Sequence, residues 1–270
     1  MRRAGTTQPT TSPRGGPSEV VRFVSTAEAH LETGPVVVID VLRAFSTAAY
    51  AFGAGARHIY LVGGVDEALA LKASLPGALA MGEDRGRRVA GFDFANSPTE
   101  VAHADLKDRV IVHRTSAGTQ GVVAATRARR LWCAGLANAS ATAAAVRDAG
   151  LGAPAYVITG WGGSASDSGA DDRATAELIE RARLGQPLRA AETARIVATS
   201  EEAARTLAIG EGHVHPEDVD RAVAVDAFAF AMEVARTPIG LRLDRVDRVD
   251  GVDPVDGEDP VRRLDEVDAG

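Results

Sequence analysis

The chain of 270 residues has little that would suit a secreted or membrane-spanning protein. Its one cysteine, Cys133, stands in the apolar stretch 131–134, where we expect a small buried side chain and not a reactive thiol. No apolar segment follows the arginines near the N-terminus, and no apolar run reaches the length that crosses a bilayer. We therefore expect a cytoplasmic protein with no membrane partner.

Positive charge is also scarce. The chain has 30 Lys and Arg against 37 Asp and Glu, a formal net charge of -7. An extended nucleic-acid surface normally needs a basic patch, so we expect no nucleic-acid partner. An anionic ligand would have to be bound by local arginines and backbone amides, because the overall field repels it.

The two ends of the chain differ in composition from the middle. Residues 1–18 carry hardly any apolar side chains and predict a disordered leader. From 241 to 270 the chain repeats Val-Asp units without a core-forming period, which predicts a solvated, acidic, low-complexity tail. Residues 19–240 are left as one α/β domain, and we leave a homodimer open.

Short β-branched runs alternate with alanine-rich stretches between these ends. The alternation predicts a three-layer α/β/α fold with a largely parallel or mixed central sheet. Residues 227–232 fit either a buried strand or a helical turn. The expected strands are 20–24, 36–40, 58–62, 78–81, 110–114, 131–134 and 156–159, and the expected helices are 47–53, 65–73, 119–129, 139–149, 171–184 and 201–208.

The most informative segment is 36–44, in which an apolar strand ends on Asp40 and Arg43. Ligands of open α/β sheets bind at the carboxyl ends of strands, so both side chains are candidate site residues. A salt bridge between the two is the structural alternative, and these residues alone do not choose.

Two more segments place polar residues just after expected strands. Glu83 follows the strand 78–81 and precedes a basic loop, so it is either a metal ligand or a solvated turn acid. Further on, Ser97 can cap a helix that starts at Pro98, with Glu100 completing a capping box, and such a start offers N–H groups to an anion. Capping leaves Asp93 unexplained.

The loop after the apolar strand 110–114 is rich in small and hydroxyl residues. Thr115, Ser116, Gly118 and Thr119 can wrap backbone amides and hydroxyls around a phosphate or sulfonate. The loop lacks the lysine and spacing of a P-loop, so it does not predict a nucleotide site, and a glycine-rich helix entry without a ligand is the alternative.

Two consecutive acids, Asp171 and Asp172, follow a glycine-rich loop at the start of an expected helix. One can face the cleft while the other favours the helix dipole, and we assign the inward position to Asp172. The alternative is that both only stabilise the helix start.

In this order the segments resemble the 2-phosphosulfolactate phosphatase family, magnesium-dependent phosphatases known from coenzyme M biosynthesis. The most specific pieces are 38–44, Gly82-Glu83, 91–93, 96–98 and 115–119. The resemblance implies a three-layer α/β fold, Mg2+ dependence and a phosphate monoester of a small acid as substrate. Two departures from the family pattern limit the resemblance. Ala117 stands where the family usually has Asn, and Asp171-Asp172 with Thr175-Ala176-Glu177 stands where it usually has Glu-Asp and Cys-Ala-Gly. These departures are compatible with the general chemistry and with a change of substrate.

Taken together, the segments supply carboxylates for a hard cation, guanidinium groups and backbone amides. We assign Asp40, Glu83 and Asp172 to Mg2+ or its waters, Asp40, Arg43 and Asp93 to catalysis, and Arg43, Asn96, Ser97, Arg114, Thr115, Ser116, Gly118 and Thr119 to the phosphate or the acidic body of the substrate. In the catalytic set, Asp93 is a general acid or an orienting residue.

The mechanism is open between direct attack by water and a phospho-enzyme on Asp40. Leu42 stands where haloacid-dehalogenase phosphatases have their second acid, which favours a metal-activated water. A phosphatase of the same family with another substrate and a non-catalytic small-anion-binding protein are the alternatives. The histidines have no ligand spacing with the cysteine, and the segment 212–216 predicts a surface turn.

Overall fold

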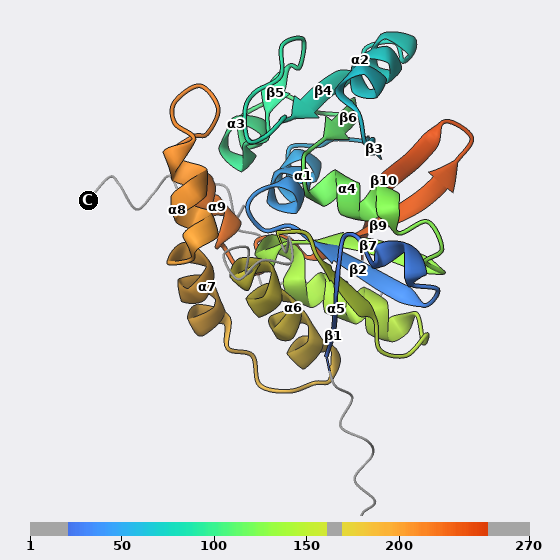
Figure 1. The fold of residues 1–270 in the computed structure, drawn as a ribbon, viewed down its shortest axis with the longest axis vertical. Coiled ribbons are helices and arrows are strands. Elements are labelled where there is room, and N and C mark those ends of the chain that lie inside the picture. The colour runs from blue at the N-terminus through green and yellow to red at the C-terminus, as the bar shows by residue number, and fades with distance from the viewer. Residues whose placement is uncertain (1–20, 161–168, 248–270) are drawn as a thin grey trace, which may run out of the picture.

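The computed structural model describes residues 21–160 and 169–247. Within them the chain forms one mixed sheet with helices packed around it (Figure 1). The strands are β1 (Arg22–Ser25), β2 (Pro35–Ile39), β3 (His58–Leu61), β4 (Leu79–Gly82), β5 (Phe94–Ala95), β6 (Val110–Arg114), β7 (Arg130–Ala134), β8 (Ala155–Ile158), β9 (Phe230–Thr237) and β10 (Gly240–Asp247). The helices are α1 (Ala44–Gly53), α2 (Val65–Ser74), α3 (Pro98–Ala102), α4 (Gly118–Ala124), α5 (Ala139–Asp148), α6 (Ala170–Arg183), α7 (Ala190–Ala198), α8 (Glu201–Ala208) and α9 (Asp218–Ala222), with 3-10 turns at Ala29–Leu31 and Leu136–Asn138.

The sheet consists of two parallel blocks joined by an antiparallel hairpin. Its strand order is β1-β8-β2-β7-β9-β10-β3-β6-β4-β5. The first four strands are parallel to one another, and so are the last four, whereas β9 and β10 pair antiparallel with each other and with the neighbouring blocks. The two blocks therefore run in opposite directions across the hairpin.

Side chains along the buried strands point alternately to the two faces of the sheet, and helices cover both faces. In β2, Val36 and Val38 pack into one apolar cluster, while Val37 and Ile39 pack into another with residues of α5 and α6. In β6, Ile111 joins the first cluster and Val112 a third cluster beneath α2. The first cluster thus takes side chains from both blocks and from α1, which lies with α4 between them (Figure 1). Period-two side-chain alternation and cover on both faces produce this layering.

The α/β class with a mixed sheet is confirmed, and so are the seven expected strands, apart from end residues. The ambiguous segment 227–232 enters strand β9 at Phe230. The expected helix 119–129 ends earlier, at Ala124, because the chain turns there to reach β7 with Ala125 and Ala128 buried. Helices α7 and α9 were not predicted.

The boundary of the acidic tail at 241 was wrong. Residues 241–247 belong to β10, which pairs with β9 and β3, and Leu243 is fully buried in the core. Leucines alternating with charged residues form a half-buried strand, a pattern that the Val-Asp repeats further on obscured. The predicted leader and the rest of the predicted tail, 248–270, lie outside the described residues. Within the described ranges no helix is long and apolar enough to span a bilayer.

Candidate active site

Asp40 lies at the point where β2 ends and the turn into α1 begins. The residue is 6% exposed, and its Oδ1 accepts a hydrogen bond from Ala44 N at 2.9 Å. The start of α4 packs directly against it, so that a Cβ added to Gly118 would lie 2.7 Å from Asp40 Oδ2 and 2.6 Å from Ala44 Cβ. Glycine is therefore required at 118, because any side chain would push the two elements apart.

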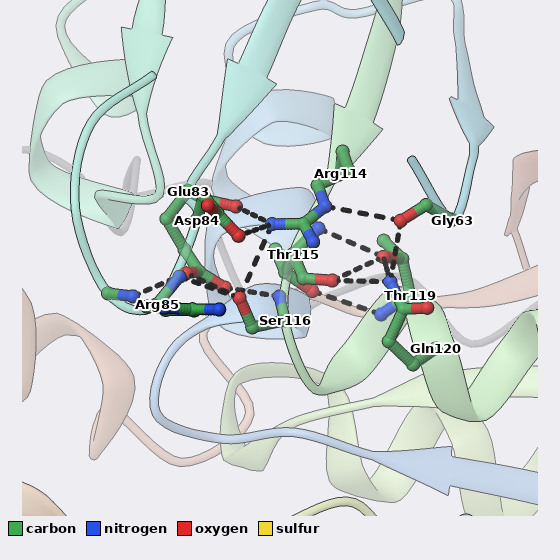
Figure 2. A network of polar contacts seen from close by, with 10 residues as sticks. Gly63, Glu83, Asp84, Arg85, Arg114, Thr115, Ser116, Thr119 and Gln120 are labelled. Carbon is green, nitrogen blue, oxygen red and sulfur yellow. Dashed lines mark hydrogen bonds and ion pairs between the residues drawn. The ribbon is translucent and has the colours of Figure 1, made fainter. Parts of the chain in front are cut away.

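Glu83 reaches the same place from the end of β4. Gly82 adopts φ 134°, where a Cβ would lie 1.9 Å from Arg114 O, and this close approach lets Glu83 N donate to Arg114 O at 3.0 Å. The Glu83 carboxylate, only 6% exposed, accepts hydrogen bonds from Gly86 N at 2.5 Å, from Ser116 N, and from Ser116 Oγ at 3.1 Å. Figure 2 shows Glu83 and Ser116 side by side.

Burial and mutual repulsion shape the electrostatics of these two acids. Burial raises the pKa of Asp40 from 3.8 to about 6, and the negative charge of Glu83 adds to this rise, while hydrogen bonds from Ala44 and Gly118 amides oppose it. None of the ion pairs between described residues includes Asp40. Asp40 therefore lacks the cation that normally compensates a buried carboxylate.

The loop 115–119 does not have the form expected of a phosphate cradle. Ser116 N is bound to Glu83, and Thr119 N donates to Thr115 Oγ1 at 3.0 Å while Thr115 N donates to Thr119 Oγ1 at 2.9 Å. Both threonines are buried. The amides of this loop thus hold the chain's own side chains, and Ser116 remains the exposed hydroxyl among them.

Asp172 is buried at the start of α6 and faces the end of β2, as predicted. Its Oδ1 accepts from Val41 N at 3.0 Å, and its Oδ2 accepts from Thr159 N at 3.1 Å and Gly160 N at 3.3 Å. Burial raises the pKa of Asp172 well above its ordinary value, and the neighbouring charge of Asp171 adds to the rise. With both oxygens accepting amide hydrogen bonds, Asp172 joins the loops after β2 and β8.

Its neighbour Asp171 is equally buried, with 3% exposed. Burial raises its pKa to about 7, and the charge of Glu202 on α8 raises it further. Sequence reasoning gave this residue no role in the site. Its burial was not visible in the sequence, and neither was the interaction with Glu202, which comes from a separate helix.

The three acids assigned to Mg2+ do not converge. In the part of the chain that the structure describes, no three Asp, Glu, His or Cys side chains form a group that could hold a metal ion. Asp40 and Glu83 interact electrostatically, and Mg2+ usually keeps several waters and takes one or two protein carboxylates. The donor set therefore fits a cation at Asp40 and Glu83 better than at all three residues.

Arg43 does not pair with Asp40, so the salt bridge considered from the sequence is not formed. The guanidinium is 4% exposed, and its Nη1 donates to Asp218 Oδ2 at 2.9 Å and to His213 O at 3.2 Å. Asp218, at the start of α9, was not predicted as a site residue. The signal available was Pro216-Glu217-Asp218, which is typical of a helix start and not of a buried counter-ion.

Ser97 caps α3 as predicted, since its Oγ accepts from Glu100 N at 3.1 Å. The same Oγ donates to Asp218 Oδ1 at 2.6 Å, and Thr99 N donates to that oxygen at 3.2 Å. Of the amides that were expected to be free for an anion, that of Thr99 is thus bound to an internal carboxylate and that of Glu100 to the Ser97 hydroxyl. Asn96 is buried, with Oδ1 3.4 Å from the ring of His113.

Arg114 lies between the loops beside Glu83 (Figure 2). Its Nη1 donates to Glu83 O at 2.7 Å and pairs with Asp84 Oδ1 at 2.7 Å, and its Nε donates to Gly63 O at 3.2 Å. Nη1 also lies 3.3 Å from Ser116 Oγ. The guanidinium is at the predicted site, where it fixes the backbone at Glu83.

Asp93 lies apart from these residues. Its Oδ2 accepts from Ala80 N at 2.7 Å inside β4 and pairs with Lys72 Nζ of α2 at 2.7 Å. Glu83 lies beyond the opposite end of β4. These contacts join β5 to β4 and α2, so the geometry gives Asp93 a structural role where the sequence predicted a catalytic one.

The match to a family of known proteins agrees with the order of these segments. The family model of 2-phosphosulpholactate phosphatase matches residues 23–213, from β1 to the loop that binds Arg43. The chain belongs to this family. The resemblance found in the sequence is thereby confirmed.

Individual members of the 2-phosphosulpholactate phosphatase family are similar over part of their length. A probable 2-phosphosulfolactate phosphatase of Bacillus subtilis is 40% identical over 144 residues, 53% of this chain and 61% of the relative. Its counterpart from Carboxydothermus hydrogenoformans is 44% identical over 112 residues, 42% of this chain and 46% of the relative. The probable 2-phosphosulfolactate phosphatase of Thermus thermophilus is 37% identical over 145 residues, which are 53% of this chain and 59% of the relative. The matched part thus spans about half to three-fifths of these relatives.

Proposed function

We propose that the chain is a Mg2+-dependent phosphatase that hydrolyses the phosphate monoester of a small acid. The substrate suggested by the family is 2-phosphosulfolactate, which water would convert to 3-sulfolactate and phosphate. Membership of the family and the names of its relatives support the reaction class. The observation that carries the proposal is Asp40, a buried carboxylate with raised pKa, next to Glu83 and without a cation partner among the described residues.

Asp40 and Glu83 would hold the cation. When bound, Mg2+ supplies a Lewis acid that polarises the phosphate ester and a water of lowered pKa. The amides of Ala44 and Gly118 orient the Asp40 carboxylate, and those of Gly86 and Ser116 orient Glu83. These donors are backbone groups that the fold already holds in place. They therefore orient the two carboxylates without losing side-chain entropy of their own.

The phosphate of the substrate needs donors that the fold has not already used. The Ser116 hydroxyl is already used, since its Oγ donates to Glu83 at 3.1 Å and accepts from Arg85 N at 2.7 Å. Arg85 has an exposed side chain and lies beside Ser116, with φ 50°, in the basic turn after Glu83 (Figure 2). We assign the phosphoryl oxygens to the Arg85 guanidinium, and Arg43 to structure, since Asp218 already neutralises it.

The identity of the acidic body is a separate question. Ala117 replaces the amide side chain expected in the loop, so a substrate group that would bind an asparagine loses that partner. A phosphatase with a different small phosphomonoester is therefore the second candidate. The reaction class needs only the carboxylates and the cation, whereas the substrate needs the loop.

A phosphate-release assay tests both candidates. The purified full chain is incubated with Mg2+ and a panel containing 2-phosphosulfolactate, 2-phospholactate and unrelated phosphomonoesters, with EDTA in a parallel series. We expect turnover of at least one small phosphorylated acid that stops in EDTA and returns when Mg2+ is restored. Turnover of phospholactate but not phosphosulfolactate would support the second candidate, and no turnover of any ester would overturn the enzyme assignment.

A further inference from the structure

The basic turn 84–87 has a backbone that the fold holds on both sides. Asp84 N donates to Arg87 O at 2.9 Å, and Arg87 N donates to Asp84 O at 3.0 Å, so the two residues form an antiparallel pair. Gly86, at the tip, adopts φ 79° and packs against the residue that follows α8, where an added Cβ would lie 2.6 Å from Ile209 Cδ1. The side chain of Arg87 therefore starts from a fixed position.

The imidazole of His213 joins this turn to the loop that follows α8. Its Nδ1 accepts from Arg88 N at 3.2 Å, and the carbonyl oxygen of the same residue accepts from Arg43 Nη1 at 3.2 Å. The ring is half-buried and lines a groove between α3 and the loop 210–216, so a ligand can reach it. Because the ring and the backbone are both held, little conformational entropy is lost when the ring binds a ligand.

Two donors compete for the lone pair of the His213 ring. Besides the amide of Arg88, Arg87 Nη1 lies 3.4 Å from His213 Nε2. A neutral imidazole has one nitrogen that accepts and one that donates. The amide is fixed in the backbone and lies nearer, whereas the guanidinium belongs to an exposed side chain, so Nδ1 keeps the lone pair for the amide. His213 Nε2 therefore carries a proton, and its N–H group lies beside a second donor.

The positive charge of Arg87 is not neutralised within the part of the chain that the structure describes. Its neighbour Arg88 pairs with Glu100 at 2.8 Å. No ion pair between described residues includes Arg87, and no described residue offers an acceptor to its guanidinium other than the ring that already donates. A cation next to an N–H donor creates a local positive potential, although the chain as a whole has a net charge of -7.

We propose that Arg87 and His213 bind an oxyanion, which is the carboxylate, sulfonate or phosphate group of a small ligand. Two oxygens of one such group accept in parallel, one from the guanidinium and one from His213 Nε2. The turn that presents Arg87 also orients Glu83 through Gly86 N, so the oxyanion site lies beside the carboxylates of the proposed reaction. The ligand is a free anion or the acidic group of the substrate, and the second of these rests on the proposed function.

Titration of the full chain with sulfate tests the site, with chloride keeping the ionic strength constant. The ring of His213 is followed at pH 8 in long-range proton–nitrogen correlation spectra, where His213→Gln identifies its signals. We expect the proton on Nε2 and a saturable shift on addition of sulfate. Arg87→Gln should weaken sulfate binding at least about tenfold, because a charged donor is lost. Arg57→Gln, which removes an exposed arginine before the start of β3, is the matched control and should leave the titration unchanged.

Three outcomes of this titration would overturn the proposal. The first is a proton on His213 Nδ1, since the ring would then offer Arg87 its lone pair. The second is a response to sulfate that does not saturate. The third is an equal affinity for sulfate in Arg87→Gln and in the unsubstituted chain.

A matched pair of esters distinguishes the two sources of the oxyanion. 2-Phospholactate carries a carboxylate where isopropyl phosphate has a methyl group, so the ratio of their kcat/KM values measures what the carboxylate contributes. If the acidic group of the substrate occupies the site, Arg87→Gln lowers this ratio about tenfold, and Arg57→Gln does not change it. An unchanged ratio in Arg87→Gln, with sulfate binding lost, assigns the site to a free anion. If neither ester is hydrolysed, the proposed function fails, and the sulfate titration still decides the site.

Discussion

Two buried carboxylates, Asp40 and Asp218, have different partners in the fold. Asp218 is fully buried and pairs with the Arg43 guanidinium at 2.9 Å, with three further donors around it. Asp40 is held by backbone amides and has no arginine or lysine partner among the described residues. The fold thus neutralises one acid internally and leaves the charge of the other to an external cation or a proton. This difference, more than burial, separates Asp218 from Asp40, the proposed cation ligand.

Removing the Asp40 carboxylate should have the largest effect on activity. In Asp40→Asn we expect kcat/KM for phosphate release to fall by about 10³-fold or more, because the cation loses a ligand and its orientation. The free energy of unfolding should stay equal or rise, since a buried uncompensated charge is removed. Phosphate release and urea denaturation measure the two quantities. A variant that loses stability together with activity would show that Asp40 resembles Asp218 after all.

Removing the Asp218 carboxylate should have the opposite effect on stability, which should fall. Asp218→Ala leaves the Arg43 cation buried and unpaired, and loss of one partner of a buried pair costs about 3–5 kcal/mol. Urea denaturation should report this loss, and Arg43→Met combined with Asp218→Leu should recover much of it, because no lone charge remains. If the double variant is as unstable as the single one, packing and not charge pairing explains the role of Asp218.

The next largest loss of stability and activity is expected where α4 contacts the end of β2. Gly118→Ala places a methyl group 2.7 Å from Asp40 Oδ2, so that α4 must move, at a cost of about 1–3 kcal/mol. Activity should fall with it, since the Gly118 amide helps to orient Asp40. Gly150→Ala is a control for glycine replacement where no atom lies within 4 Å, although its φ of 63° carries a strain of its own. Full activity in Gly118→Ala would contradict the role of this contact.

Protonation of the buried Asp40 and protonation of the buried His113 should have opposite effects on the stability of the fold. The pKa of Asp40 is raised to about 6, so the folded chain binds this proton more tightly than the unfolded chain, and its contribution to stability grows as pH falls from 6 towards 4. Burial lowers the pKa of His113 from 6.5 to about 3, so the unfolded chain gains the proton first, and stability is lost as pH falls below 6.5. Each slope is at most about 1.4 kcal/mol per pH unit.

Denaturation between pH 7 and 4 in EDTA tests this opposition. Relative to the unsubstituted chain, Asp40→Asn should become less stable as pH falls, and His113→Gln should become more stable. Parallel curves for the unsubstituted chain and Asp40→Asn would mean that Asp40 does not titrate in this range in the folded state.

Much of the fold followed from local patterns. The β-branched runs and alanine-rich stretches determine the strands and most helices, and the cap at Ser97 determines where α3 begins. What the sequence could not reveal depended on distant pairing. The reversal of the second parallel block arises from the hairpin β9–β10, whose first strand was ambiguous and whose second was hidden in an acidic repeat.

The candidate site shows the same limit. Asp40, Glu83 and the loop 115–119 do come together, although β2 runs opposite to β4 and β6. Which amides they occupy was not predictable, since a loop that looks suited to bind a phosphate also suits a carboxylate of the same chain. The partner of Arg43 comes from 175 residues further along, and no local pattern indicates it.

The smallest effect is expected at Asp93, where sequence and structure disagree most. Its partner Lys72 is 25% exposed and Asp93 30%, and partly exposed ion pairs contribute about 0–1 kcal/mol. Lys72→Ala should therefore lower the free energy of unfolding by no more than about 1 kcal/mol and leave kcat/KM within about twofold. Asp93→Asn should behave alike, since an amide oxygen can still accept from Ala80 N. If Asp93→Asn instead lost activity as Asp40→Asn does, with stability intact, Asp93 would be the general acid, and the site would have to extend along β4 to reach it.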